Sequence, residues 1–397
     1  MVKCGVNKFL RRKNKMKMVI FFSVCMMMFL AIPAKTFAQG ESAVPFLLLA
    51  PDSRFSALGE SGAGLADNSS AIFWNPAGIA FLSGTELSIT HSNWLPQFNL
   101  DLFYDFLSFR TYVEDIDGSI TSSVTYMNFG EFIRTGENDP TPLGTFSAFD
   151  AALTLGYATK LGTDWGVGMN FRIIHSQLST QPTGEEQGSG VATSVSFDLA
   201  AMWRPEVLDL FGWKTENRFS IGANLSNLGP KITYIDQAQS DPIPTNFRLG
   251  MAFHLLKDEF NSLIFTLDFS KLLVSRDSSG HSDEFYQAIF TAWGDDSFSN
   301  ELRDVVTSMG AEYWYGTPGD FLFALRAGFF YEDPSYGNRQ FMTFGAGLRY
   351  DIYGFDFSYI SSIAENHPLD QTLRFTIVIG WGAVDQERGF PRGVAGI

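Results

Sequence analysis

Cysteine is almost missing from the sequence, since the 397 residues include only Cys4 and Cys25. Both precede residue 38, in a stretch that has the pattern of a secretory signal peptide. Basic residues crowd positions 3–17, an apolar run follows over 18–32, and small residues surround Ala38. We therefore expect residues 1–38 to be a signal peptide. The exported chain would then have no thiol, which excludes disulfides, thiolate metal sites, cysteine nucleophiles and a lipid-modified N-terminal cysteine.

Positive charge is also scarce. Only 18% of the residues are charged, and the formal net charge is −15. Eight of the 28 basic residues would leave with the signal peptide, whereas all 43 acidic residues would remain, so the exported chain would carry −23. A chain this acidic is a poor candidate for binding nucleic acid or anionic lipid through its general field.

Long hydrophobic runs are absent after the signal peptide, because no stretch approaches the roughly 20 apolar residues of a membrane helix. Aromatic residues are nevertheless abundant at 15%, with 39 Phe, and there are 37 Gly. An exported chain rich in Phe and Gly but without membrane helices must be tested as an outer-membrane β-barrel.

Apolar and polar residues alternate along much of the chain, as they do in barrel strands, where every second side chain faces lipid. Residues 148–160 read AFDAALTLGYATK, and residues 165–173 repeat the alternation after a turn of only three residues. The pattern predicts fourteen strands, an even number of about ten residues each. They are 85–93, 103–112, 119–129, 148–160, 165–177, 191–203, 218–228, 246–256, 262–272, 307–316, 320–331, 340–350, 353–362 and 371–382.

The connections between these strands alternate between long and short, as expected when short turns face the periplasm and long loops face outward. The long ones are 94–102, 130–147, 178–190, 229–245 and 273–306. The short ones are 113–118, 161–163, 257–261, 317–319 and 351–352, and 204–217 is an exception to the rule. Both ends of the exported chain would then lie on the periplasmic side.

A soluble β-sandwich is the alternative, because its strands alternate as well. The polar faces here carry mostly Gly, Ala, Ser and isolated charges, which favours an enclosed lumen over a wet surface. The charged residues that we place in the lumen are Asp150, Arg172, Asp198, Arg248, His254, Asp268, Glu312, Arg326, Arg349, Asp356 and Arg374. They are interpreted either as a structural set of mutually neutralising charges or as a ligand path.

The insertion 273–306 has helical spacing of apolar residues and is interpreted as a loop over the barrel mouth or as a partner-docking helix. His91, His175, His281 and His367 have no metal-ligand spacing, and there is no G-x-S-x-G. The GESGAG stretch at 59–64 does not follow a strand, so we do not interpret it as a phosphate loop.

Residues 68–82 place an Asn-Pro step inside an apolar stretch, where a paired strand would not tolerate proline. From residue 44 the chain reads VPFLLLAPDSRFSALGESGAGLADNSSAIFWNPAGIAFL, which resembles the lumen hatch of FadL-like barrels. Nearly the whole exported chain resembles, more narrowly, the PorV family of the type IX secretion system. The matching stretches are PFLLLAPDSR (45–54), WNPA (74–77), LSNLGPKITY (225–234), IPTNFRLG (243–250), LDFSKLLV (267–274), EYWYG (312–316), LRAGFFYE (325–332), FGAGLRYDIYGFDFSY (344–359) and HPLDQTLRF (367–375).

This resemblance implies an all-β outer-membrane barrel of about 14 antiparallel strands at residues 85–382. It also implies an N-terminal hatch at residues 39–84 and a periplasmic tail at residues 383–397. The hatch would include Asp52, Arg54, Trp74, Asn75 and Pro76.

The implied function is not enzymatic and needs no cofactor or metal. The protein would accept exported proteins that carry a C-terminal signal domain at the translocon barrel and pass them to the surface attachment complex. The alternatives are a FadL-like transporter of hydrophobic small molecules and an outer-membrane enzyme such as a lipid A deacylase.

Overall fold

The computed structural model describes residues 42–98, 100–135, 141–179, 189–210, 213–236, 239–275, 282–317, 320–364 and 367–382. The predicted signal peptide and the predicted tail therefore lie outside the described residues, as does His281. No helix among the described residues is long and apolar enough to cross a membrane.

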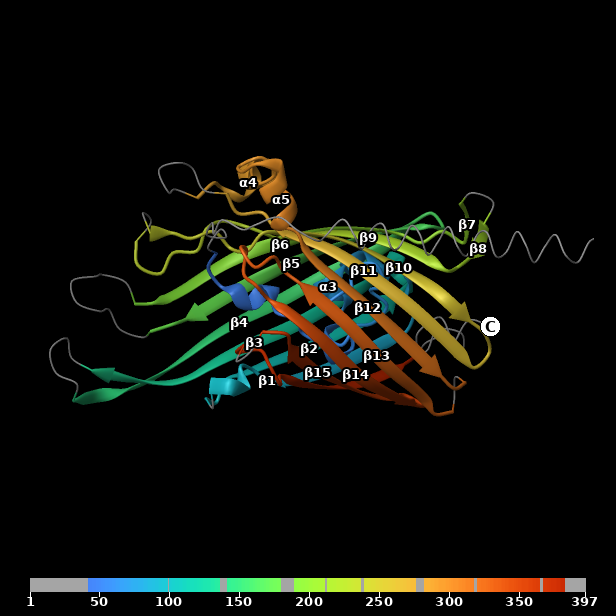
Figure 1. Cartoon of the computed structure of the whole chain (residues 1–397), viewed down its shortest axis with the longest axis horizontal. Helices are drawn as coiled ribbons and strands as arrows, with labels where there is room; N and C mark the ends of the chain where they lie inside the picture. The colour runs from blue at the N-terminus through green and yellow to red at the C-terminus, as the bar shows by residue number, and fades with distance from the viewer. Residues whose placement is uncertain are drawn as a thin grey trace, which may run out of the picture. The chain divides into compact units, whose positions relative to one another are not determined.

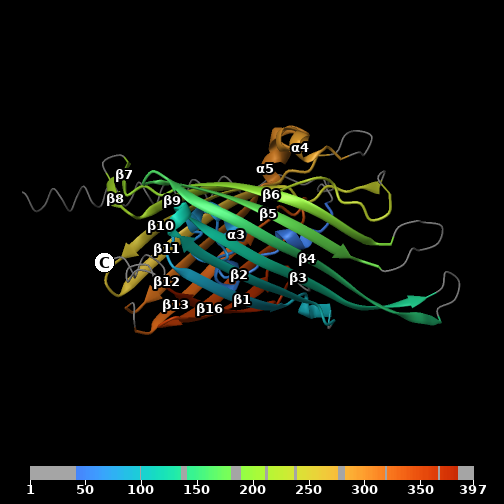
Figure 2. The same ribbon diagram turned by 180° about the vertical axis from the view of Figure 1, so that it is seen from behind.

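Fourteen antiparallel strands form a closed barrel (Figures 1 and 2), which confirms the predicted fold class. The barrel strands are β1 (Thr85–Asn93), β2 (Phe103–Val113), β3 (Gly118–Thr135), β4 (Pro142–Leu161), β5 (Trp165–Gln177), β6 (Val191–Trp203), β9 (Phe219–Leu228), β10 (Asn246–Lys257), β11 (Asn261–Leu272), β12 (Val306–Tyr315), β13 (Leu322–Tyr331), β14 (Gln340–Tyr350), β15 (Tyr353–Ser362) and β16 (Leu373–Trp381). The barrel closes where β1 pairs with β16, with Thr85 opposite Trp381. The first strand therefore begins beside the end of the last one.

Alternation along the strands separates an inner face from an outer one. On β5, for example, the burial of successive residues alternates strictly, with Arg172 inside and Phe171 and Ile173 outside. Large apolar side chains on the outer face are half exposed, such as Leu155 at 53% and Leu325 at 66%. An apolar belt of this kind is the surface that a barrel presents to lipid.

Two features differ from the sequence-based expectation. β3 and β4 are longer than predicted, because they pair from the wall outward into a two-stranded ribbon in which Glu131 to Thr135 lie opposite Ser147 to Pro142. The connection 204–217, which broke the rule of short turns, contains a separate hairpin of β7 (Val207–Leu210) and β8 (Trp213–Glu216). This connection is longer than a short turn because it folds into a hairpin of its own.

The described chain also contains short helical elements. Before the wall come η1 (Pro45–Leu48), α2 (Ser53–Ser56), α3 (Ala71–Trp74) and η2 (Pro76–Phe81). Between strands lie η3 (Pro96–Phe98), η4 (Glu114–Ile116), α4 (Phe285–Thr291) and α5 (Phe298–Arg303). The N-terminal segment, which we define as residues 42–84, runs inside the ring of strands (Figure 1).

Candidate functional site

The candidate site is the interface between the N-terminal segment and the inner face of the wall. Hydrogen bonds among the described residues join the segment to eleven of the fourteen wall strands. Seven of these bonds are Ser69 to Glu86 on β1, Asn75 to Ala201 on β6, Gly64 to Ser220 on β9, Gly62 to Asp268 on β11, Arg54 to Glu312 on β12, Gly59 to Thr343 on β14 and Ser53 to Thr376 on β16. The other four strands are β2, β3, β5 and β10. These partners are spread around the barrel, so the segment is fixed by the interior as a whole.

The Asn75-Pro76 step starts a helix and lies outside the paired strands of the wall. Pro76 is the first residue of η2, where its missing N–H and fixed φ cost nothing. Asn75 is extended, as a residue before proline should be, and its side-chain oxygen accepts a hydrogen bond of 3.0 Å from the amide of Ala77. Its side-chain nitrogen donates to the carbonyl of Ala63 at 3.0 Å. One side chain thus caps η2 and ties it to an earlier turn of the segment.

A buried ion-pair chain connects the segment to the wall. It contains three carboxylates and three guanidinium groups in the order Asp67, Arg54, Glu312, Arg326, Asp356 and Arg349. Arg54 joins the two parts, with 2.6 Å from Nη1 to Asp67 and 2.7 Å from Nη2 to Glu312. Each Arg lies beside a carboxylate that faces another Arg, so the formal charges of the chain sum to zero.

Arg54 stays charged in this environment. Burial lowers its pKa, but the carboxylates of Asp67 and Glu312 outweigh burial and hold the pKa well above the usual value. Because each of these side chains is at most 5% exposed, removing one partner would leave an uncompensated buried charge.

The glycine-rich GESGAG turn binds a carboxylate of its own chain. The amides of Gly62 and Ala63 donate to one oxygen of Asp268 at 2.9 and 2.8 Å. Successive N–H groups in a turn form an anion-binding concavity, and here the anion is a side chain of β11. The Nη1 of Arg248 lies 3.8 Å from the same oxygen, a distance too long for a hydrogen bond.

Trp74 also attaches the segment to the wall, and its side chain is fully buried. Its indole donates to Asp52 at 2.8 Å, and the guanidinium of Arg248 lies 4.8 Å from its ring centroid. Asp52 also caps α2 by accepting a hydrogen bond from the amide of Phe55. Burial raises the pKa of Asp52 above its ordinary value, although both hydrogen bonds oppose that rise.

Another polar cluster surrounds Asp198 on β6. Arg172 donates to both of its carboxylate oxygens, at 3.1 and 2.8 Å. Asn170 donates both to Asp198 and to the carbonyl of Ile72 in the segment, each at 2.8 Å. This cluster therefore also supports the turn that precedes Asn75.

Three predicted lumen residues stand apart from these clusters. Asp150 is buried at 2% exposure, and the Nδ1 of His254 has no hydrogen-bond partner within the described part of the chain. Arg374 is 1% exposed, and none of its guanidinium nitrogens has a hydrogen-bond partner among the described residues. Its guanidinium lies 5.8 Å from the ring centroid of Trp94.

Sequence reasoning missed two members of the site on β1 and β2. Glu86 accepts a hydrogen bond of 2.6 Å from the amide of Ser69, and Arg110 donates to Glu86 at 3.3 Å and to the carbonyl of Ser83 at 2.8 Å. Both side chains are 1% exposed. They alternate with apolar neighbours such as Leu87 and Phe109, and this alternation could have identified them.

Wall glycines allow the segment to lie close to the strands. A Cβ on Gly310 would lie 2.5 Å from the carbonyl oxygen of Leu58, and a Cβ on Gly328 would collide with the backbone of Leu58 and Gly59. Glycine is needed at these positions because backbone approaches backbone.

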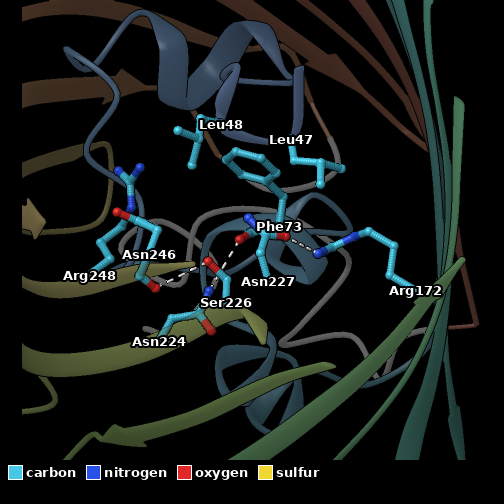
Figure 3. Close-up of a pocket in the computed structure, with 9 residues that line it drawn as sticks. All are labelled: Leu47, Leu48, Phe73, Arg172, Asn224, Ser226, Asn227, Asn246 and Arg248. Atoms are coloured by element: carbon cyan, nitrogen blue, oxygen red, sulfur yellow. Dashed lines mark hydrogen bonds between the residues drawn. The ribbon is translucent and has the colours of Figure 1, made fainter. Parts of the chain in front are cut away.

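A small pocket lies between the segment and β5, β9 and β10 (Figure 3). Three of its lining residues, Leu47, Leu48 and Phe73, come from the segment. The wall contributes Arg172, Asn224, Ser226, Asn227, Asn246 and Arg248. The wall side is thus polar and rich in hydrogen-bond donors, and it is formed partly by residues that also hold the segment.

Catalytic and metal-binding geometry is not evident in the described ranges. They contain no group of three or more His, Cys, Asp or Glu residues that could hold a metal ion. His91 and Asp105 lie 2.6 Å apart, but both are exposed on the outer face of the wall.

The fold and this interface define a class: a β-barrel of the outer membrane whose interior holds its own N-terminal segment. A family model described as "Type IX secretion system protein PorV" matches residues 36–279. The chain belongs to this PorV family, and it is a protein of the outer membrane. No curated protein sequence matches it.

Solved structures that resemble the chain include a FadL homologue of Pseudomonas aeruginosa, at 11% identity and a TM-score of 0.48, covering 86% of this chain and 99% of the other. The toluene transporter TbuX of Ralstonia pickettii matches at 11% identity and a TM-score of 0.45, covering 84% and 98%. The toluene transporter TodX of Pseudomonas putida matches at 11% identity and a TM-score of 0.44, covering 87% and 98%. Nothing about the ligand of this chain follows from similarities this distant.

Proposed function

We propose that this protein binds exported proteins carrying a C-terminal signal domain at the secretion translocon and passes them to the surface attachment complex. Membership of the PorV family over residues 36–279 is the observation that carries this proposal. The contacts of the N-terminal segment support it, since an occupied interior suits a binding protein better than an open pore.

We further propose that residues 39–84 act as a hatch, with Asp52, Arg54, Trp74, Asn75 and Pro76 among the residues that hold it. The ion pairs of Arg54 and the cap formed by Asn75 support this role. In the same proposal residues 1–38 are removed as a signal peptide, and residues 383–397 form a periplasmic tail.

The β3–β4 ribbon is the extracellular feature best suited to contact a folded partner. It extends the sheet beyond the wall on the side of the long loops, and it exposes Ile133 at 64% and Leu143 at 61%. Phe132 and Phe146 stack on it with centroids 5.7 Å apart. Exposed apolar side chains on a paired ribbon offer a partner both shape and apolar area.

Deletion of the gene tests the proposal. Exported proteins with the C-terminal signal domain should accumulate in the periplasm, and complementation with the full chain should restore their surface display. A deletion strain with normal surface display would refute the secretion role. Co-purification of the translocon barrel from native membranes is the second expected result.

The alternative function, transport of hydrophobic small molecules, has less support. The described pocket has a polar wall side, whereas sites for apolar ligands are mostly apolar. Uptake of a labelled fatty acid should therefore be the same with and without the gene. We propose no catalytic role, and purified protein should leave the mass of lipopolysaccharide unchanged.

A further inference from the structure

α4 and α5 pack against the outside of the barrel at the extracellular ends of β10 and β11. Phe247 and Lys271 are cross-strand neighbours, and both lie on the outer face because Arg248 and Asp268 point inward. Trp293, which follows α4, makes an edge contact with Phe247 and lies under the ammonium of Lys271, each at 5.9 Å. Figures 1 and 2 both show the two helices beyond the outer side of the strands. The described part of this insertion therefore packs beside the wall, and it also contacts the neighbouring loops through Lys231 and Tyr336.

Lys271 is the wall residue that forms ion pairs with these helices. It continues an outer row of Leu263, Phe265, Leu267 and Phe269 on β11, yet it is only 3% exposed. The ammonium lies 2.9 Å from Glu301 of α5 and also pairs with Asp304. The helices thus neutralise and cover the one cation of this outer row.

The height of Lys271 on the wall places the helices at the edge of the membrane. From Leu263 to Lys271 the strand rises about 26 Å at roughly 3.3 Å per residue. A tilt of about 40° reduces this to about 20 Å along the membrane normal, close to the apolar belt of about 25 Å. Lys271 therefore marks the outer rim of the belt, and α4 and α5 lie beside it.

Both helices expose large apolar side chains, whereas Asp295 and Asp296 between them are exposed acidic residues. Phe290 is 78% exposed, Phe298 79%, Leu302 58% and Tyr286 56%. Aromatic side chains concentrate where a membrane protein crosses the lipid–water interface, and short amphipathic helices lie in that interface with their apolar face inward. These exposed side chains belong to helices that lie against the outer row of β10 and β11, so lipid is the occupant that they fit.

We propose that α4 and α5 form an interfacial anchor, in which Phe290, Phe298 and Leu302 insert into the outer leaflet beside β10 and β11. The anchor would fix the height and rotation of the barrel in the membrane. This inference is independent of the secretion role, because it concerns contact with lipid alone.

Spin labels test the proposal directly, since the exported chain contains no cysteine of its own. Phe290→Cys and Phe298→Cys would each carry a nitroxide in the exported chain, residues 39–397, reconstituted into palmitoyl-oleoyl-phosphatidylcholine vesicles. Power saturation with oxygen and with a water-soluble nickel chelate then compares lipid and water access. Phe265→Cys, on the outer row of β11, is the control in lipid, and Asp115→Cys, in an exposed turn, is the control in water.

We expect both helix labels to resemble the Phe265 control, with oxygen access high and nickel access several-fold lower than at Asp115. Heat-modifiable electrophoresis would confirm that each labelled barrel is folded. Nickel access equal to that of the Asp115 control would overturn the proposal, because the face would then lie in water and be free for a protein partner. Labels that face water in the vesicles but become protected when the translocon is added would overturn it in the same way.

Discussion

Replacement of Arg54 by Met should release the N-terminal segment while leaving the barrel closed. Arg54 donates four hydrogen bonds, two to Glu312 and two to Asp67. Without it, Glu312 keeps Arg326, but Asp67 loses both of the hydrogen bonds that Arg54 supplies. Breaking a buried ion pair from one side costs about 3–5 kcal/mol, which raises the open population of the segment by about a hundredfold to several thousandfold.

Hydrogen exchange measured by mass spectrometry reads this opening directly. Peptides from residues 45–82 should exchange faster in Arg54→Met, while peptides from β14 and β15 should keep the wild-type rate. Lys214→Met is the matched control, because it removes an exposed cation from β8. The double variant Arg54→Met/Asp67→Asn should regain part of the loss, since it removes the orphaned charge as well. Unchanged exchange over residues 45–82 would refute the assignment of Arg54 as the link between segment and wall.

Three further predictions concern single groups of the interior. Asp52→Asn keeps an acceptor for Trp74 but removes the charge. Because the pKa of Asp52 is raised in the folded protein, Asp52 contributes most to folding stability at a pH below its ordinary pKa, and this contribution is lost as the pH rises. The melting temperature of the variant should therefore rise relative to that of the wild type as the pH increases. A variant that becomes more stable relative to wild type as the pH falls would contradict this prediction. Asn75→Ala should lower stability by about 1–3 kcal/mol and speed exchange in η2, whereas Asn75→Asp should keep the cap. Arg374→Met should keep or raise the melting temperature, because a buried guanidinium without hydrogen bonds is exchanged for an apolar side chain. This gain should outweigh the loss of the contact with Trp94 and of the attraction to Glu60 and Asp52; a large decrease would show that the charge is needed.

The strands could be predicted from the sequence because lipid on one side and a polar interior on the other impose a two-residue period. The predicted strand 353–362 coincides with β15, and most other ends agree within two residues. The ribbon was missed because alternation weakens beyond the wall, where the β3–β4 register shifts between Asn128 and Glu131. Outside the membrane neither side of a strand must be apolar, so the period carries less information.

The pairings of the interior could not be predicted in the same way. Alternation predicts that Glu312 points inward. Its partner Arg54 lies 258 residues earlier, on a segment whose sequence has no regular alternation of apolar and polar residues. Such a pair depends on the closure of the barrel and on how the segment is threaded through it. Asp67 was missed for the same reason, because a coil residue gives no sign of the direction of its side chain.

A covalent tether tests whether the segment must move for the protein to function. The hydroxyls of Ser53 and Thr376 lie 2.8 Å apart, and both side chains are buried, so Ser53→Cys/Thr376→Cys should form a disulfide between α2 and β16. Hydrogen bonds to eleven wall strands argue that leaving the lumen would break many buried polar interactions at once, whereas a partner at the ribbon needs none of them broken. The oxidised double variant should therefore display exported proteins at the surface as the wild type does, and each single cysteine variant controls for the loss of the hydrogen bond. If secretion fails in the oxidised form and recovers on reduction, the segment must open during function, and the lumen would then be part of the path.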